Sequence, residues 1–517
     1  MLAIGRPLAL VDVHRVARNE SPVSLDESAR AELARTREHL ESALARGATI
    51  YGVNTGFGAL SETRVGPDAL ADLQINLLRS HACGVGEPLS EAVVRALLLL
   101  RAHTLAQGAS GASPALVEHL LAMLDRGVTP FVPSQGSVGA SGDLAPLAHL
   151  ALVVIGEGEA TVRGDLRGRL PGAAALAAVD LAPYTLGPKE GLSLINGTQV
   201  MTAIAAISAV DAGELVIAAD VLGALSLDAL LGSIRPCDPR IHAGKPHPGQ
   251  IASAALIREL VDGSALNTSH ACCGLVQDAY SLRCMPQVHG AVRSALTYVA
   301  GALNIEVNAF TDNPLVLARD DGGFDVISGG NFHGASVAVP IDHLSAALTT
   351  LATISERRLD RFLNPATSRG LPPFLAERPG LESGMMMLQV TASALASECK
   401  SLSFPASVDT IPTSAGKEDH VSMGPIAARK LEAVVAAVAR VLAIEGIIAA
   451  RALDLREQPT SPTLERARQV IRRYVSSDTA DRSTGAEIEA LAAAIRRGEL
   501  REAVGVAHPL GAASDAS

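Results

Sequence analysis

The amino-acid sequence predicts a mainly α-helical fold, a long helical bundle with a loop-rich N-terminal part. Hydrophobic residues make up 48% of the 517 residues, yet aromatic residues make up only 3% and tryptophan is absent. A core built from Ala, Leu, Val and Ile favours closely packed helices. Long segments rich in Ala and Leu dominate the chain from about Gly191 onward, so we expect the bundle there.

The N-terminal part is expected to alternate helices with shaped loops. A first helix is predicted to begin at Ser24, which has capping-box spacing to Glu27, and to end at Gly47. Segment 51–58 has three glycines in eight residues, which suits neither a helix nor a regular strand, so we expect a shaped loop. Two further predicted helices, Glu91–Leu105 and one from Ser113-Pro114 to Gly127, lead into a second loop over 128–142.

The rest of the chain is expected to form the bundle. Its predicted helices are Val200–Leu230, Val288–Ile305, His343–Phe362, Met386–Leu402 and Ile426–Leu453. We therefore divide the chain into an N-terminal part (1–200) with both loops, a helical bundle (201–510), and a small polar tail (511–517) expected to be disordered.

Composition and charge exclude several classes of protein. The net charge of −11 argues against a nucleic-acid partner, which normally requires a clustered basic face. The six cysteines have no C-x-x-C spacing and are expected to be reduced thiols of a cytoplasmic protein. Arg6 and Pro7 interrupt the first apolar stretch, unlike the core of a signal peptide. Asp211, Glu445 and Arg451 cut the longest apolar stretches, so we expect no membrane span.

Residues 136–149 read GSVGASGDLAPLAH, and common glycine-rich motifs fit this segment poorly. Its glycines are spaced three apart, unlike a dinucleotide-binding loop, and no Lys-Ser/Thr follows as in a P-loop. Ser141 lacks the spacing of a G-x-S-x-G nucleophile elbow. A simple glycine-rich turn remains one interpretation of the segment.

Ala140-Ser141-Gly142 offers a further chemistry. If the backbone bends tightly, the amide nitrogen of Gly142 can reach the carbonyl carbon of Ala140 and close a five-membered ring. Loss of one water in ring closure and of a second from the Ser141 side chain leaves 4-methylidene-imidazol-5-one. Ordinary side chains are nucleophiles, acids or bases, so a strong electrophile has to come from a cofactor or from modified backbone.

This segment resembles the signature of the aromatic amino acid ammonia-lyase family over its whole length. The resemblance extends over nearly the whole chain, through YGVNTGFG at 51–58, NLLRSHACGVGEP at 76–88, LINGTQ at 194–199, VQDAYSLRC at 276–284, TDNPL at 311–315, SGGNFHG at 328–334, LPPFL at 371–375 and EDHVSMG at 418–424. It implies a prosthetic group formed autocatalytically from Ala140-Ser141-Gly142, with no metal and no soluble cofactor.

The resemblance also implies roles for individual residues. Tyr51 matches the loop tyrosine that removes the β-proton of the substrate, and Asn196 matches the residue that hydrogen-bonds to the new ring. Gln277, Tyr280 and Arg283 are spaced three apart, so on a helix they would share one face. Arg283 can bind an α-carboxylate with two hydrogen bonds, Gln277 and Tyr280 can assist in positioning and proton transfer, and Phe332 matches a phenylalanine beside the prosthetic group.

The substrate is inferred from Ser80-His81 and Glu418. Ser80-His81 resembles the Ser-His of family members that act on histidine, although some tyrosine aminomutases share it. A carboxylate at Glu418 can accept a hydrogen bond from an imidazole, whereas burial against a benzene ring brings no compensation. Many members that act on histidine have Asn-Gln before this glutamate, and Gly416-Lys417 stand here instead. A solvated pair with Lys417 is the other interpretation of Glu418.

Taken together, the resemblance implies elimination of ammonia from L-histidine to give trans-urocanate. The alternatives are a lyase or aminomutase for tyrosine or phenylalanine, and a non-catalytic helical assembly. The expected site residues are separated by long helices, and the family brings them together in a homotetramer whose active sites combine loops of three subunits. No histidine spacing typical of a metal site is present, so no catalytic metal is expected.

Overall fold

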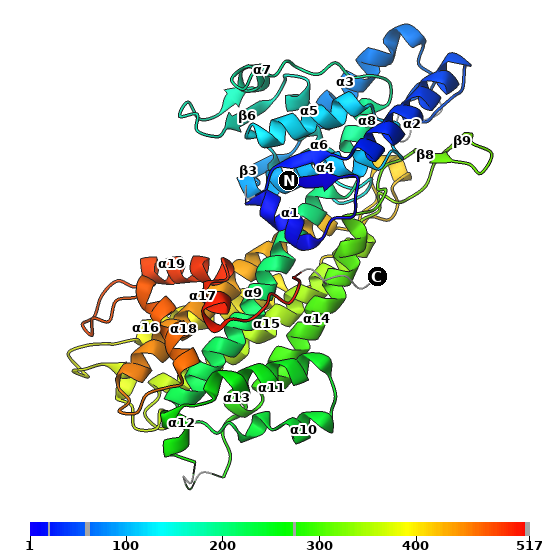
Figure 1. Cartoon of the computed structure of the whole chain (residues 1–517). Helices are drawn as coiled ribbons and strands as arrows, with labels where there is room; N and C mark the ends of the chain where they lie inside the picture. The colour runs from blue at the N-terminus through cyan, green and yellow to red at the C-terminus, as the bar shows by residue number, and fades with distance from the viewer. Residues whose placement is uncertain (19–20, 57–62, 272–273, 275, 512–517) are drawn as a thin grey trace. The chain divides into compact units, whose positions relative to one another are not determined.

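The computed structural model describes residues 1–18, 21–56, 63–271, 274 and 276–511, and these form a mainly α-helical fold (Figure 1). The predicted fold class is confirmed. Residues 57 and 58 of the first predicted loop, Cys272 and Cys273, and residues 512–517 of the expected tail lie outside the described residues.

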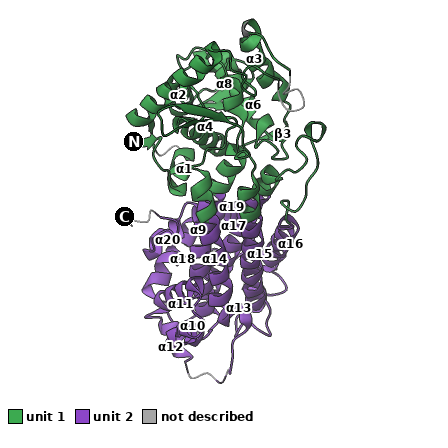
Figure 2. Ribbon diagram, turned by 90° about the vertical axis from the view of Figure 1, so that its right-hand side faces the viewer, with its two compact units in different colours: residues 1–207, 300–341, 405–429 green, residues 208–299, 342–404, 430–517 purple. Residues whose placement is uncertain are grey.

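The chain forms two compact units (Figure 2). Unit 1 comprises residues 1–207, 300–341 and 405–429, and unit 2 comprises residues 208–299, 342–404 and 430–517. The expected N-terminal part, 1–200, lies wholly in unit 1. Two later segments of the chain also belong to this unit, and they carry Phe332 and Glu418.

Unit 1 combines helices with short paired strands. Its helices are α1 (Leu10–Ala17), α2 (Glu27–Ala45), α3 (Leu70–His81), α4 (Glu91–Ala106), α5 (Pro114–Asp125), α6 (Leu144–Val154), α7 (Gly172–Ala177) and α8 (Glu190–Ile195). Strands β1 (Leu2–Ile4) and β2 (Val23–Leu25) pair in parallel. The other pairs are antiparallel: β3 (Val85–Pro88) with β5 (Pro133–Gln135), and β8 (Leu315–Ala318) with β9 (Phe324–Ile327). In a three-stranded antiparallel sheet, β6 (Glu159–Val162) lies between β4 (Val128–Pro130) and β7 (Leu170–Pro171). Helix α4 is buried from Val93 to Ala106 and packs on α1 and α5, so it forms the centre of the unit.

Unit 2 is built from helices. Those that lie wholly in it are α10 (Pro239–Ala243), α11 (Pro248–Val261), α12 (Ala265–Ser269), α13 (Tyr280–Arg283), α16 (Met386–Leu402), α18 (Pro462–Tyr474), α19 (Gly485–Arg496) and α20 (Glu499–Val504). The long helices α9 (Gln199–Ala229), α14 (Met285–Glu306), α15 (Ala335–Leu363) and α17 (Gly424–Asp454) contribute residues to both units. These four and α16 are the five helices expected for the bundle.

The first predicted helix start is wrong. Helix α2 begins at Glu27 and is capped by Asp26, whose carboxylate accepts the backbone N–H of Ser28 at 3.0 Å. Ser24 instead lies in β2, where it pairs with Ala3 of β1. This long-range pairing outweighs the local capping-box pattern, which is a weak preference by comparison.

Charged residues inside the apolar helices are buried and paired. In unit 2, the guanidinium of Arg358 on α15 bonds to the carboxylate of Glu445 on α17, and both side chains are fully buried. Ser226 on α9 and Ser355 on α15 donate hydroxyl hydrogen bonds to the same carboxylate at 2.7 and 2.5 Å. Burial of a charge is tolerated when hydrogen bonds and an opposite charge satisfy it, as they do at Glu445.

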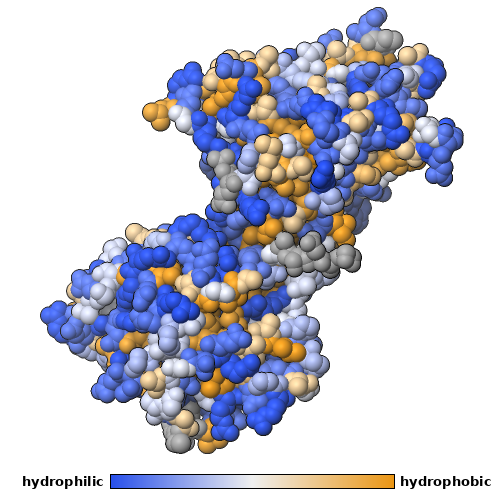
Figure 3. Space-filling model, in the orientation of Figure 1, coloured by the Kyte–Doolittle hydropathy of each residue, from blue (hydrophilic) through white to orange (hydrophobic). Residues whose placement is uncertain are grey.

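Three long helices contain apolar stretches of membrane-spanning length despite the charged residues within them. By length and composition, α9, α15 and α17 each contain a stretch apolar enough to cross one. Those stretches are 100%, 67% and 83% buried within the protein, so most of their apolar surface is covered by the protein's own side chains. Hydrophilic and apolar residues are interspersed on the visible surface (Figure 3).

Candidate active site

Three helices of unit 1 bring their ends together around the predicted prosthetic-group loop. Helices α3, α6 and α8 pack against one another in pairs. The ends nearest the chemistry carry His81 at the last residue of α3, Asp143 before the first residue of α6, and Asn196 after the last residue of α8. The expected residues His81 and Asn196, and Asp143 next to the predicted loop, are thereby placed at the ends of rigid elements.

The turn at Gly142 has room only for glycine. Gly142 has φ +72°, and a Cβ on it would lie 2.1 Å from the carbonyl oxygen of Gly197. Gly142 and Gly197 form a parallel bridge, and the backbone N–H of Asp143 donates to Gly197 O at 2.8 Å. The conformation of Gly142 and its close contact with Gly197 therefore exclude a side chain at this position.

Residues after Glu418 hold the preceding part of the loop. The hydroxyl of Ser422 donates to Gly139 O at 3.0 Å, and the backbone N–H of Met423 donates to Val138 O at 2.9 Å. Gly139 has φ +70°, and a Cβ there would lie 2.3 Å from Ser422 Oγ. The EDHVSMG segment thus closes over the loop that precedes Ala140.

Asp143 links the loop to the start of α9. Its fully buried carboxylate accepts the backbone N–H groups of Val200 and Met201 at 2.8 and 3.0 Å. Burial raises the pKa of Asp143 to about 7, and these two N–H groups oppose the shift. Asp143 was not among the predicted site residues, although it stands next to Gly142 in the signature.

A stability measurement tests the environment of Asp143. Because its pKa rises from 3.8 to about 7 on folding, its contribution to the free energy of unfolding is fully present below about 3.8 and is lost as pH rises to about 7. Asp143→Asn cannot titrate. We therefore expect wild type to lose stability relative to this variant between these pH values, with a constant difference above pH 7, in urea unfolding followed by circular dichroism. A difference that does not vary with pH would contradict the buried-acid assignment.

Glu418 lies against Ser141 of the predicted prosthetic-group loop. Ser141 Oγ donates to Glu418 Oε1 at 3.1 Å, and Thr413 Oγ1 donates to Glu418 Oε2 at 2.6 Å. Thr413 and Glu418 also form an antiparallel bridge across the short turn Ser414–Gly416. Both carboxylate oxygens are therefore engaged by hydroxyl groups of the described residues. The geometry favours the site interpretation of Glu418 over a surface pair with Lys417, and Thr413 is a contributor that sequence reasoning missed.

The ring of His81 is held through Nδ1, which lies 2.9 Å from the carbonyl oxygen of Leu77 and 3.0 Å from Ser80 Oγ. Because a carbonyl oxygen can only accept, the contact with Leu77 favours the tautomer with the proton on Nδ1 and Nε2 as the acceptor. Burial lowers the pKa of His81, while the Leu77 carbonyl and the carboxylate of Glu418 act in the opposite direction. His81 and Glu418 thus lie close enough to interact electrostatically, and His81 presents a neutral imidazole.

Hydrogen bonds hold both the main chain and the side chain of Asn196. Arg101, which is fully buried, donates to Asn196 O at 2.8 Å, and burial lowers the pKa of this guanidinium to about 10, with Asp312 opposing the shift. Asn196 Nδ2 donates to Asn313 O at 3.0 Å and lies 3.4 Å from Asp312 Oδ1. Its Oδ1 is buried without a hydrogen-bond partner among the described residues. This oxygen is an acceptor, so only a further donor could satisfy it.

Tyr51 and Phe332 lie in turns of unit 1, and both are half-buried. The turn of Tyr51 is tied to α3, because Gln74 donates its side-chain amide to Gly52 O at 3.2 Å and accepts the N–H of Leu192 in α8. The segment of Phe332 is tied to that of Glu418 through His333, whose Nε2 donates to the carbonyl of His420 at 3.2 Å.

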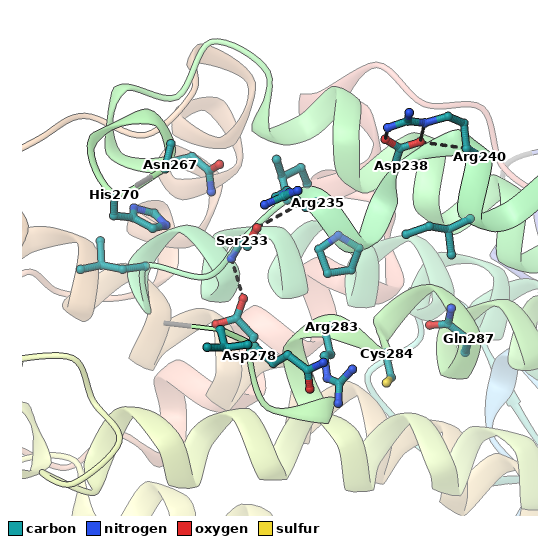
Figure 4. Close-up of a pocket in the computed structure, with 17 residues that line it drawn as sticks. Ser233, Arg235, Asp238, Arg240, Asn267, His270, Asp278, Arg283, Cys284 and Gln287 are labelled. Carbon is teal, nitrogen blue, oxygen red and sulfur yellow. Dashed lines mark hydrogen bonds and ion pairs between the residues drawn. The ribbon is translucent and has the colours of Figure 1, made fainter. Parts of the chain in front are cut away.

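Gln277, Tyr280 and Arg283 belong to unit 2 and do not share one helix. Helix α13 begins only at Tyr280, after an extended Ala279, so Gln277 precedes the helix. The guanidinium of Arg283 lies 4.5 Å from the ring centre of Tyr280, which is 70% exposed. Gln277 and Arg283 line a pocket of about 890 Å³ in unit 2, with residues such as Ser233, Asn267 and Gln287 (Figure 4). Their part in catalysis stays a prediction.

Over the part of the chain that the structure describes, no group of three or more His, Cys, Asp and Glu side chains is placed to hold a metal ion. The arrangement in unit 1 combines a turn that only glycine fits, a carboxylate bonded to Ser141, and an imidazole whose pKa is lowered by burial. Such a set can bind a polar aromatic ring beside an electrophile.

Known proteins resemble the chain over its full length. The profile of the family described as aromatic amino acid lyase matches residues 8–473. A histidine ammonia-lyase of Sorangium cellulosum is 52% identical over 97% of this chain and 98% of its own. The crystal structure of histidine ammonia-lyase from Trypanosoma cruzi has a TM-score of 0.91 at 37% identity, covering 100% of this chain and 99% of its own. A tyrosine aminomutase from Streptomyces globisporus also has a TM-score of 0.91, at 36% identity and 98% coverage of both chains. This chain belongs to the aromatic amino acid lyase family.

Proposed function

We propose that this protein is a histidine ammonia-lyase, which eliminates ammonia from L-histidine without oxidation and releases trans-urocanate. The observation that carries the proposal is the placement of Glu418, which bonds to Ser141 and interacts with the neutral imidazole of His81. The identity to the curated histidine ammonia-lyase of Sorangium cellulosum supports the same substrate.

The proposed reaction uses a ring formed by Ala140, Ser141 and Gly142, whose methylidene carbon supplies an electrophile for the amine of the substrate. The φ of Gly142 and its contact with Gly197 support such a ring. Tyr51 acts as the base that removes the β-proton. We further propose that the reaction needs no metal, so activity should survive prolonged dialysis against a chelator.

Glu418 and His81 select histidine over other aromatic amino acids. The carboxylate of Glu418 accepts the N–H of the substrate imidazole, and the imidazole of His81 lies close enough to Glu418 to interact with the same carboxylate. A phenyl or phenol ring placed there would leave Glu418 desolvated without a matching donor at the same position, which costs free energy. This difference favours histidine, whereas the overall fold does not discriminate, because a tyrosine aminomutase is equally similar in structure.

We propose that Gln277, Tyr280 and Arg283 complete the substrate site in a homotetramer, with Arg283 binding the α-carboxylate. The exposure of Tyr280 and of apolar side chains such as Met387 (62%) and Phe404 (73%) suits surfaces that become covered on assembly. Light scattering should give four times the chain mass, and a monomer with full activity would contradict the shared site. We also propose that the protein is located in the cytoplasm.

A product assay tests the substrate. The protein is incubated separately with histidine, tyrosine and phenylalanine, and the products are searched for urocanate, coumarate, cinnamate and β-amino acids. Urocanate from histidine alone supports the proposal. Turnover of tyrosine but not histidine would favour the lyase or aminomutase alternative, and no turnover by a protein of unmodified mass would favour a non-catalytic assembly.

Glu418→Gln tests the recognition of the imidazole. Loss of a hydrogen bond to a charged group costs about 1.5–3 kcal/mol, so kcat/KM for histidine is expected to fall roughly 10- to 100-fold. Ring formation should be retained, as judged by intact mass. Asp419→Asn, a change at the exposed neighbouring carboxylate, serves as the matched control and should behave as wild type. Unchanged kinetics of Glu418→Gln would return this residue to the surface-pair interpretation.

A further inference from the structure

A wholly buried ion pair lies next to Asn196 of the proposed site in unit 1. Lys189 Nζ bonds to Asp312 Oδ2 at 2.6 Å, and neither side chain is exposed. Ser193 stands between them, accepting from Lys189 Nζ at 3.0 Å and donating to Asp312 Oδ2 at 3.0 Å. Lysine is rarely buried completely, so the position of Lys189 requires a physical reason.

The pair bridges the two ends of α8. Lys189 precedes the first residue of this helix with φ +70°, and Asn196 follows its last residue. Asp312 reaches both, because Oδ2 accepts from Lys189 while Oδ1 lies 3.4 Å from Asn196 Nδ2. The adjacent Asn313 O accepts the same Nδ2 at 3.0 Å. The carboxamide of Asn196 is therefore oriented by residues 312 and 313.

A gain in the free energy of unfolding is a weak explanation for a buried ion pair. Desolvation of two charges cancels most of their attraction, and apolar replacements of similar size are often equally stable. Burial lowers the pKa of Lys189, and Asp312 opposes this effect. Burial would raise the pKa of Asp312, but Lys189 and Arg101 together hold it below its usual value. The carboxylate is thus kept ionised next to Asn196.

We propose that the Lys189–Asp312 pair is a positioning element that sets how the carboxamide of Asn196 meets the ring formed by residues 140–142. This inference rests on the proposed function. Asn196-Gly197 lies directly against Gly142-Asp143, so a rotation of the carboxamide changes the polar groups offered to the ring.

Lys189 limits how strongly Asp312 competes for Asn196. With Oδ2 neutralised by Lys189, the contact between Asp312 Oδ1 and Asn196 Nδ2 stays long, and this N–H can turn to the ring while the bond to Asn313 O is kept. An unpaired buried carboxylate would draw the amide toward itself. Without either charge, the carboxamide would have only Asn313 O to orient it.

The experiment removes both charges together. The double variant Lys189→Met/Asp312→Leu removes the pair as a whole but leaves the buried Arg101 without the opposing charge of Asp312, so we expect a thermal unfolding temperature below that of wild type. Intact mass should show ring formation in only part of the folded chains. The chains that carry the ring should have kcat lower by roughly 10- to 100-fold, the usual effect of removing a group that orients a reacting residue, with KM for histidine unchanged.

The pair Arg358–Glu445 in unit 2 provides a matched control, because it is equally buried and bonds to neither Asn196 nor residues 140–142. Arg358→Met/Glu445→Leu should retain complete ring formation. If the Lys189/Asp312 variant does not fold, Asp312→Asn, which keeps the shape of the side chain, is measured in the same way.

Complete ring formation with unchanged kcat in a folded variant would overturn the positioning role, as would an equal loss of ring formation in the Arg358/Glu445 control. Failure of the proposed function is distinguishable from both results. In that case wild type itself would show no mass deficit and no urocanate, whereas failure of this inference alone leaves wild type fully modified and active.

Discussion

Ser141→Ala is expected to abolish formation of the prosthetic group and to reduce turnover of histidine by on the order of 10³-fold or more. Alanine has no hydroxyl to lose, so a methylidene cannot form even if the backbone cyclises. The wild-type chain should fall short of its sequence mass by two water molecules, and the variant should lack at least the water that comes from the side chain. Mass spectrometry of the intact, denatured chain measures both values directly.

The same variant separates chemistry from folding. Ser141 is half-buried and bonds to Glu418, so its replacement by a smaller residue should change the free energy of unfolding by only about 1 kcal/mol. Ser137→Ala is a useful comparison, since Ser137 bonds to the same loop through Gly142 O at 3.2 Å but supplies no atom of the ring. Full activity of Ser141→Ala would refute the electrophile assignment.

Gly142→Ala is expected to prevent ring formation for a steric reason. The new Cβ would lie 2.1 Å from Gly197 O, and a residue other than glycine at φ +72° adds roughly 1–2 kcal/mol of strain. The loop must move away from Gly197, which separates Ala140 and Gly142 from Asn196. We expect loss of both water eliminations, loss of activity, and a free energy of unfolding lower by about 3 kcal/mol or more.

Gly164→Ala isolates the steric part of this effect. Gly164 has φ +80°, yet nothing lies within 4 Å of the position that its Cβ would take. This variant should carry only the backbone strain and should form the ring completely. If Gly142→Ala gave the same unfolding free energy and the same mass deficit as Gly164→Ala, the contact with Gly197 would have no role in ring closure.

Local signals predicted several helices closely. Helix α16 has the predicted bounds, and Ser113-Pro114 begins α5, with the Ser113 hydroxyl accepting the N–H of Leu116 at 3.2 Å. These features depend on periodicity and on capping within one or two turns, which a sequence displays directly. The site residues expected in unit 1 were found through motifs, and Ser141, Glu418 and His81 do lie together in the structure.

Features that depend on distant parts of the chain were not predictable in the same way. Ser24 looked like a helix cap but pairs with a strand more than twenty residues away. Lys189 and Asp312 are 123 residues apart, and each alone has the pattern of a surface charge. The same holds for Thr413, whose relation to Glu418 depends on a turn with positive φ at Ser414 and Ala415. Only tertiary contacts distinguish these residues from their solvated counterparts.

The bonds from Ser422 and Met423 to the loop before Ala140 impose an order on maturation. During synthesis the signature segment emerges long before residues 422 and 423 exist, so the loop lacks the contacts that hold Gly139 and Val138. We therefore expect a nascent chain truncated before residue 422 to keep its full, unmodified mass. On the proposed function, the methylidene carbon would then arise only after residues 422 and 423 have packed on the loop, late in synthesis.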